Sequence, residues 1–317
     1  MTSVAQIMRF LTPSGRGRNE LLGIEFGEDY VSFAHIRRVS NQQPQLLHCE
    51  QLLFEAGSNP VELLRARLLK LGLLTVPCSF VLTAGAYQLV LGEAPKVPAE
   101  ELAEALRWRL KDVVQYPITE AVVDAFLLPE DSARGTNRMA YAVVCESKNI
   151  QLLADHAKLA GLSLKAIDIP ELALRNLAEA CCDTERGIAL VKLVQGGGSL
   201  QIFRGGALYL SRQFSLPYNG GLLDDLPADA LILELQRSLD YFERQMRQVP
   251  PTHVYLCGEN VTPDKLTGAI SNALAVSINV LDLASGLQIA EGVAEHSLSL
   301  CLAAVGVALR QDQLGSS

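Results

Sequence analysis

Short apolar runs separated by turn residues dominate the first part of the chain. Extended segments are predicted over residues 21–26, 30–36 and 46–54, with a turn at Gly27 between the first two. A helix is expected to begin at Pro60 and to end before Gly72, and a further strand follows over 79–83. This pattern predicts a β-meander that leads into alternating helices and strands.

The segment 85–161 has an alternation of its own and is interpreted as an inserted subdomain. Its helices are predicted over 99–115 and 149–159, and its polar segment 130–137 is expected to form an exposed hairpin loop. Its strands are predicted over residues 87–91, 121–128 and 139–145.

The second half repeats the opening plan of the first half. A strand over 164–169 and a helix over 171–182 close the first half, and an apolar run over 188–194 then leads into a glycine turn at 195–199. Further strands are predicted over residues 200–203, 207–214, 254–257 and 277–281, and further helices over 228–247, 262–274 and 298–310. The repeated order of strands and turns predicts two related α/β halves.

These segments divide the chain into two lobes. We expect a first lobe over 19–184, which carries the insert at 85–161, and a second lobe over 185–310. An amphipathic leader over 1–18 precedes them, and both a frayed terminus and contact with a membrane surface or a partner remain open for it. A short tail over 311–317 follows the second lobe.

The charge balance disfavours a generic nucleic-acid binder. Lysine and arginine number 27 against 35 aspartate and glutamate residues, which gives a net charge of −8, whereas phosphate affinity requires dense basic charge. The longest apolar run, over 298–309, is shorter than the about 20 residues that cross a bilayer, and no signal peptide is evident. We therefore expect a soluble protein that stays in the cytoplasm.

Cysteine and histidine show no metal-site pattern. None of the seven cysteines forms a Cys-x-x-Cys pair, and Cys181 and Cys182 are adjacent, which suits neither an ordinary disulfide nor a pair of zinc ligands. The five histidines lack the i, i+4 spacing that brings two imidazoles to one helical face. We expect reduced, mostly buried thiols and no bound metal.

Two glycine-containing turns, one near the start of each half, are the candidate ligand-binding elements. Backbone N–H groups in such turns can hold phosphates, but the carboxylates of Glu28 and Asp29 beside Gly27 would repel them. Glycines in a hairpin also serve backbone geometry alone, and this alternative stays open for the second turn. The second turn consists of Gly196, Gly197, Gly198 and Ser199.

No enzyme signature accompanies these turns. The sequence has no P-loop, no dinucleotide-binding fingerprint and no nucleophile elbow. Asp168, Asp224 and Asp225 are interpreted as caps or turn formers, because a lone aspartate next to proline or in a polar turn usually has that role. No catalytic residue is predicted.

Several short strings in a fixed order over residues 20–310 resemble the PilM family of actin-like proteins of type IV pilus assembly, and within it the branch that serves MSHA pili. In the first half they are LGIEFG at 22–27, YPI at 116–118 with Glu120 and Asp124, and DIPE at 168–171. In the second half they are FRGG at 203–206, SR at 211–212, ELQRSL at 234–239, YLCG at 255–258 and AVGVALR at 304–310.

The resemblance implies an α/β, bilobed actin-like fold (a duplicated ribonuclease H-like fold) with an inserted subdomain in the first lobe. It also implies a scaffold that is peripheral at the inner membrane because it binds the cytoplasmic N-terminal tail of a PilN-like membrane protein. In that family the tail lies between the main body of the first lobe and the insert. Carried onto this chain, the resemblance implies partner contacts near Tyr87, Leu89, Leu91, Trp108 and Tyr116, although core packing is an equal alternative for Trp108.

The nucleotide positions of the family are not matched here. Glu25 stands where the family has an aspartate, Glu28 and Asp29 stand where small hydroxyl residues line the phosphate, and no acidic residue occurs at 192–195 ahead of the second turn. The adenosine-side glycine pair is reduced to Gly258, which Glu259 follows. We therefore expect no enzyme activity and no cofactor, as in the actin-like cytoplasmic part of GspL proteins of type II secretion. The alternative is a protein that binds ATP with Mg²⁺ and whose nucleotide state controls partner binding.

Overall fold

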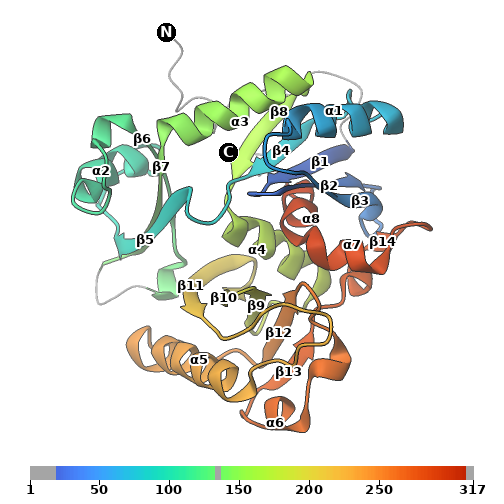
Figure 1. The fold of residues 1–317 in the computed structure, drawn as a ribbon. Helices are drawn as coiled ribbons and strands as arrows, with labels where there is room; N and C mark the ends of the chain where they lie inside the picture. Colours follow the sequence, from blue (N-terminus) through green and yellow to red (C-terminus); the bar gives the residue numbers. More distant parts are fainter. Residues whose placement is uncertain (1–18, 133–136, 312–317) are drawn as a thin grey trace.

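The structure is a computed structural model, and it describes residues 19–132 and 137–311 (Figure 1). The leader predicted over 1–18, and all but the first residue of the predicted tail, lie outside the described residues. Three β-sheets account for the described strands, one of six strands, one of five and one of three.

The first lobe is built on the six-stranded sheet, in the order β14-β3-β2-β1-β4-β8. Strands β1 to β3 form the predicted antiparallel meander, and β4 and β8 continue the sheet in parallel with β1. Helices α1 (Pro60–Leu71) and α3 (Ser147–Ala160) cover its outer face. The strands are β1 (Glu20–Phe26), β2 (Tyr30–Arg37), β3 (Gln45–Leu53), β4 (Cys78–Val81), β8 (Leu164–Asp168) and β14 (Gln288–Ile289).

Helix α1 begins and ends where its sequence predicts. The side chain of Asn59 accepts a hydrogen bond from the N–H of Val61 at 3.0 Å, and this caps the helix start. At the other end Gly72 adopts φ 72°, the left-handed conformation that closes a helix at little cost for glycine.

The second lobe repeats the connectivity of the first. Its five-stranded sheet has the order β11-β10-β9-β12-β13, which matches β3-β2-β1-β4-β8 strand for strand. The predicted repeat of the opening plan is therefore confirmed. The strands are β9 (Ile188–Val194), β10 (Gly197–Arg204), β11 (Ala207–Ser215), β12 (His253–Gly258) and β13 (Ser277–Val280), and helices α5 (Ala228–Asp240) and α6 (Gly268–Ser271) cover their outer face (Figure 1).

The insert is the three-stranded sheet, with the order β5-β7-β6. Its strands are β5 (Tyr87–Glu93), β6 (Ala121–Leu127) and β7 (Met139–Glu146), all antiparallel to their neighbours. Helix α2 (Leu102–Arg107) packs on one face, where Leu102, Leu106 and Leu110 are buried against the sheet. The other face, which carries Leu89 and Tyr141, is turned toward the second lobe.

The helix predicted over 99–115 is wrong in extent. Only α2 is α-helical, and single 3₁₀ turns flank it at Ala99–Glu101 and Trp108–Leu110. Two arginines use tertiary hydrogen bonds here: Arg107 donates to the carbonyl of Ala121 at 2.8 Å and Arg109 to that of Glu93 at 3.0 Å. These bonds hold the segment against the strands, and tertiary contacts override helix propensity.

Three predicted helices of the second half are shortened or broken as well. The helix over 228–247 ends as α5 at Asp240 and continues in a π turn, Tyr241–Gln245. The helix over 298–310 is interrupted at Cys301 into α7 (Glu295–Leu300) and α8 (Leu302–Ala308). The helix over 262–274 is reduced to α6, because Thr267 and Gly268 are poor helix formers and Lys265 turns its amine to the carbonyl of Gly221.

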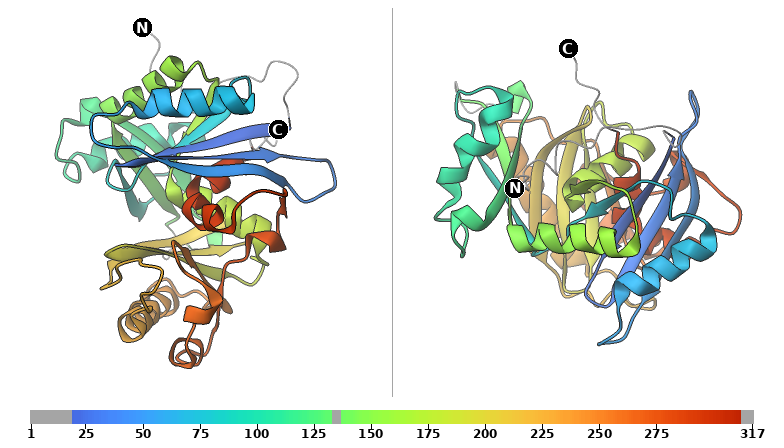
Figure 2. Two further views of the ribbon diagram at one scale, coloured as in Figure 1. Left: turned by 45° about the vertical axis from the view of Figure 1, so that its right-hand side comes forward. Right: turned by 90° about the horizontal axis from the view of Figure 1, so that it is seen from above.

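Two helices lie between the sheets of the two lobes (Figure 2). Helix α4 (Pro170–Cys181) follows β8, and α8 returns from the second half to pack on β1, β2 and β4. The two helices approach closely because Gly306 has no side chain. A Cβ placed on Gly306 would lie 2.2 Å from the carbonyl oxygen of Ala173 in α4.

A side chain at Gly306 should therefore force the central helices apart. Gly306→Val is expected to lower the free energy of unfolding by about 2 kcal/mol or more, because the added atoms meet backbone that has no room to move. Chemical denaturation monitored by circular dichroism measures this loss. Gly268→Ala in α6 is the control, since the added methyl meets only ordinary contacts and should leave stability unchanged or slightly raised. Equal stability of both variants would contradict the packing argument.

Candidate functional site

A cavity of about 700 Å³ lies between the lobes, and we call it the interlobe cavity. The turn from β1 to β2 borders it on one side and the turn from β9 to β10 on the other. It brings together six of the predicted cofactor residues: Gly27, Glu28, Gly196, Gly197, Gly198 and Ser199. Gly258, the seventh, does not line this cavity.

The second glycine turn is shorter than predicted. Only Gly196 has a turn conformation, with φ +80°, whereas Gly197 and Gly198 are already part of β10. A Cβ on Gly197 would lie 2.4 Å from the carbonyl oxygen of Phe214, and one on Gly198 would lie 2.8 Å from that of Lys192. Gly258, at φ +134°, is likewise packed against the backbone of Leu193. These close approaches explain the glycines without a ligand.

Carboxylates outnumber amines around the interlobe cavity. Glu25, Glu28 and Glu171 line it, and Lys192 is the single basic residue that does so among its described lining. Glu25 is buried and accepts hydrogen bonds from the hydroxyls of Ser32 and Tyr30. An anion in this cavity would meet repulsion from more charges than attract it.

Glu171 connects all three parts of the molecule. It stands in the first turn of α4, and Tyr87 of the insert donates its hydroxyl to Glu171 Oε2 at 2.5 Å. Ser211 of β11 in the second lobe donates its hydroxyl to Glu171 Oε1 at 3.4 Å. Burial raises the pKa of the Glu171 carboxyl above its ordinary value, even though these bonds oppose the rise. Glu171 is part of the string DIPE at 168–171, but no local sequence pattern indicates its bridging role.

A second bridge joins the insert to the second lobe. Tyr209 donates its hydroxyl to Asp131 Oδ1 at 2.8 Å, Arg204 forms an ion pair with the same carboxylate, and Gln248 donates to the Asp131 carbonyl at 2.7 Å. Tyr141 of β7 adds a bond, because its hydroxyl accepts the N–H of Ser211 at 3.0 Å. The loop expected to be exposed over 130–137 is exposed at Glu130 and Asp131, although the second lobe binds Asp131, and the expectation is wrong for the buried Ser132. Residues 133–136 lie outside the described part.

The remaining candidates for chemistry have structural partners. Asp168 is buried and bonds to Arg310 at 2.8 Å, and Asp224 accepts the N–H of Gly221 at 3.0 Å, as turn formers do. Within residues 19–132 and 137–311, no three His, Cys, Asp or Glu side chains converge on a point that could hold a metal ion. All seven cysteines are free thiols.

A second cavity, of about 450 Å³, lies between the insert and the main body of the first lobe, and we call it the insert cavity. Strand β6 forms one wall, β8 and the start of α4 form another, and the turn from β10 to β11 closes it. Most of its lining is apolar, and Asp124 and Arg175 are among its polar residues. Arg175 Nε is buried and has no hydrogen-bond partner among the described residues, which is a costly state for a donor.

The five predicted partner residues do not come together. Tyr87 lines the interlobe cavity, and Leu89 and Leu91, two and four residues along β5, point toward the second lobe instead. Tyr116 packs beside α2 on the opposite face of the insert sheet, and the Trp108 residue after α2 is 62% exposed. None of the five lines the insert cavity. Three of them are on β5, which lies at the far edge of its sheet from β6, and Tyr116 is on the face that α2 covers.

Comparison with known proteins identifies the fold. A chain of the solved PilM–PilN type IV pilus biogenesis complex superposes with a TM-score of 0.70 at 21% identity, covering 92% of this chain and 98% of that chain. The cytoplasmic domain of EpsL, an inner membrane component of the type II secretion system of Vibrio cholerae, superposes with a TM-score of 0.52 at 12% identity, covering 92% and 96%. No protein-family model matches the sequence. No curated protein matches it.

The chain therefore has the bilobed, mixed α/β actin-like fold, and the predicted fold class is confirmed. The two strand-for-strand related sheets are the lobes, and the three-stranded sheet is attached to the first. In the described part of the chain, no helix has the length and apolarity that a membrane span requires.

Glu171 should give stability a pH dependence. The folded state holds its proton more tightly than the unfolded chain, so its contribution is present below the ordinary pKa of 4.5 and is lost as pH rises through the raised value. Glu171→Gln removes the ionisation and is expected to flatten this part of the profile. Melting temperatures measured between acidic and neutral pH test it, with the exposed Glu185→Gln as control. The same slope in wild type and Glu171→Gln would refute the assignment.

Proposed function

We propose that this protein is a PilM-like, actin-like scaffold of a type IV pilus assembly machine, which acts by protein binding. The observation that carries the proposal is the similarity to a chain of the PilM–PilN complex over nearly the whole of both chains. The similarity to the cytoplasmic domain of EpsL, an inner membrane component of a type II secretion system, supports a role in a membrane-associated assembly. The strings that resemble the PilM family add independent support from sequence.

The partner that we propose is a PilN-like inner-membrane protein, bound through its cytoplasmic N-terminal tail. The protein itself would then be cytoplasmic and peripheral at the inner membrane. We infer that the tail lies in the insert cavity, since this cavity has a mostly apolar lining with a few polar groups that can fix the direction of an extended peptide. The buried Arg175 Nε would find its missing acceptor in a carbonyl of the peptide.

We further propose that the pilus is of the MSHA type and that the chain has the role of the MshI proteins. This finer assignment rests on the sequence strings, in particular LGIEFG at 22–27 and AVGVALR at 304–310. The structure gives these strings a common role, because Gly23 in β1 lies against the backbone of Ala304 in α8.

We also propose that the protein works without ATP turnover. A triphosphate in the interlobe cavity would face Glu25 and Glu28 with only Lys192 to offset its charge, and phosphoryl transfer needs positioned metal and cationic groups. The bridges through Glu171 and Asp131 join the lobes and the insert by protein contacts alone. The alternative, a nucleotide that controls partner affinity, finds a single basic residue, Lys192, for its phosphates among the described lining of this cavity.

Arg175→Glu is expected to weaken binding of the PilN-like tail peptide by about tenfold or more, since it replaces a donor with a charge that repels carbonyl oxygens. Isothermal titration of the full-length chain with the synthetic peptide measures the dissociation constant. Trp108→Ala is the control, and it also tests the contact predicted from sequence. Unchanged affinity in Arg175→Glu together with a loss of affinity in Trp108→Ala would show that the tail binds on the α2 side of the insert. Absence of binding to the wild type would contradict the proposed partner.

Titration of the wild type with ATP and Mg²⁺ is expected to give no saturable heat, because the interlobe cavity has excess negative charge. Glu28→Lys serves as the matched variant, since it converts the repulsion into attraction without filling the cavity. If the cavity has a weak affinity for the nucleotide, Glu28→Lys should bind it more tightly than the wild type does. Micromolar binding to the wild type that is lost in Glu28→Lys would contradict the proposal and favour the nucleotide-controlled alternative.

A further inference from the structure

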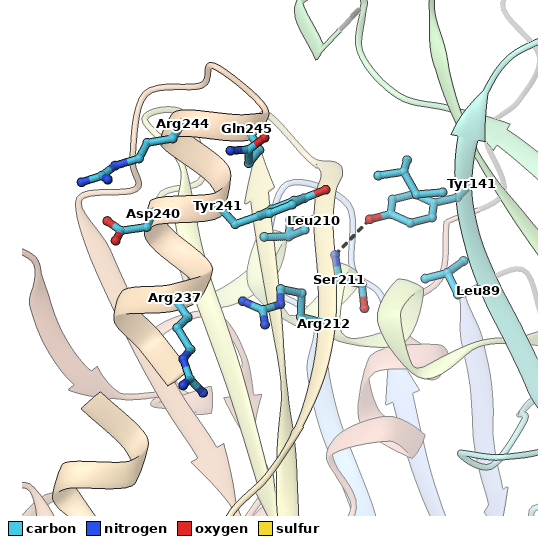
Figure 3. A pocket seen from close by; sticks show the side chains of 11 residues that line it. Leu89, Tyr141, Leu210, Ser211, Arg212, Arg237, Asp240, Tyr241, Arg244 and Gln245 are labelled. Atoms are coloured by element: carbon cyan, nitrogen blue, oxygen red, sulfur yellow. Dashed lines mark hydrogen bonds between the residues drawn. The ribbon is translucent and has the colours of Figure 1, made fainter. Parts of the chain in front are cut away.

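A third cavity, outside both sites described above, is an open groove between the insert and the second lobe (Figure 3). Its volume is about 660 Å³. Leu89 and Tyr141 project from the insert sheet on one side, Tyr241 reaches toward them from the π turn after α5, and Leu210 of β11 lies on the α5 side of its strand. The floor of this groove is therefore apolar.

Arginines mark the second-lobe side of the same cavity, which we call the arginine groove. They are Arg212 on β11, Arg237 on α5 and Arg244 in the π turn. Arg212 donates to Ser238 Oγ at 3.1 Å, and Arg237 donates to Glu234 Oε1 at 2.6 Å, while the side chain of Arg244 is exposed. Three guanidinium groups against the carboxylates of Asp240 and Glu234 make a basic site on a chain whose net charge is −8.

A loop elsewhere on the second lobe carries exposed apolar and acidic side chains, which complement the apolar floor and the arginines of the groove. Between β11 and α5, Leu222 is 71% exposed and Leu223 is 94% exposed, and the exposed Asp225 follows them closely. Adjacent leucines with so much area in water mark an interaction site more often than a neutral surface. The acidic side chain beside the two leucines disfavours binding of this loop to an anionic lipid surface, because like charges repel.

The base of this loop is held in place. Tyr218 donates its hydroxyl to the carbonyl of Glu259 at 3.1 Å, Asn260 donates to that of Gly220 at 2.7 Å, and Lys265 donates to that of Gly221 at 3.0 Å. The two leucines are thus presented on a fixed support, which reduces the entropy lost when they bind. Their exposure also shows that they do not fill the arginine groove of their own chain.

We propose that the leucine loop of one copy docks in the arginine groove of a second copy, with Leu222 and Leu223 on the apolar floor and Asp225 near the arginines. The contact joins two different surfaces, so it is heterologous, and repetition of it builds a ring or an open chain of copies. This self-association goes beyond the proposed scaffold function and does not depend on the identity of the pilus partner. The contact area of one loop is small, so the association is weak and concentration dependent.

Two variants separate the two surfaces. Leu223→Ser damages the loop and leaves the groove intact, and Arg237→Glu/Arg244→Glu damages the groove and leaves the loop intact, with all three residues exposed so that folding is preserved. Leu53→Ser is the matched control, since Leu53 is a leucine 72% exposed on the other lobe. Melting temperatures check that each variant is folded.

Sedimentation velocity of the full-length proteins over a range of concentrations tests the proposal. We expect wild type and Leu53→Ser to associate, the two interface variants to weaken association by about tenfold or more, and added salt to weaken it in the wild type. An equimolar mixture of the two interface variants should form a one-to-one complex, because one supplies the loop and the other the groove. A wild type that stays monomeric, association that Leu223→Ser leaves unchanged, or a mixture that remains monomeric would each overturn the proposal.

Discussion

The burial of one carboxyl group, that of Glu171, between two lobes and an insert is the constraint on which the arrangement depends. A carboxyl removed from water requires hydrogen-bond donors, and here they come from two other parts of the molecule, Tyr87 and Ser211. Each donor can reach Glu171 only when the insert and the second lobe stand in their observed positions. Side chains of the protein itself therefore join the three parts across the interlobe cavity.

The same two strands border two different cavities. Tyr87 on β5 and Gln213 on β11 line the interlobe cavity, whereas Leu89 and Leu210, two and three residues along, line the arginine groove. The insert cavity lies at the opposite edge of the insert sheet, at β6. A small rotation of the insert would change all three cavities together, so that binding in one cavity would alter the shape of the other two.

The sequence predicted the architecture well because hydrophobic periodicity reports burial. The alternating runs of β1 to β3 and the cap residues Asn59 and Gly72 have local causes, and the structure contains the elements they predict. The helix over 262–274 failed because Lys265 is used in a distant contact, which no local pattern reveals. The interlobe turns were found by their glycines, but Glu171, Asp131 and Arg175 acquire their roles from partners 40 or more residues away or from a cavity that exists only in the fold.

Helix α8 has a consequence for the order in which the protein forms. Residues 302–308 cover the inner face of a sheet whose first strand begins at Glu20, so during synthesis the meander waits until the second lobe has been made before its second face is shielded from water. During translation the nascent first lobe exposes the apolar surface that α8 covers in the folded protein. Chaperones and proteases would meet the newborn chain at this surface, and a truncated transcript would yield a half that cannot complete its own core.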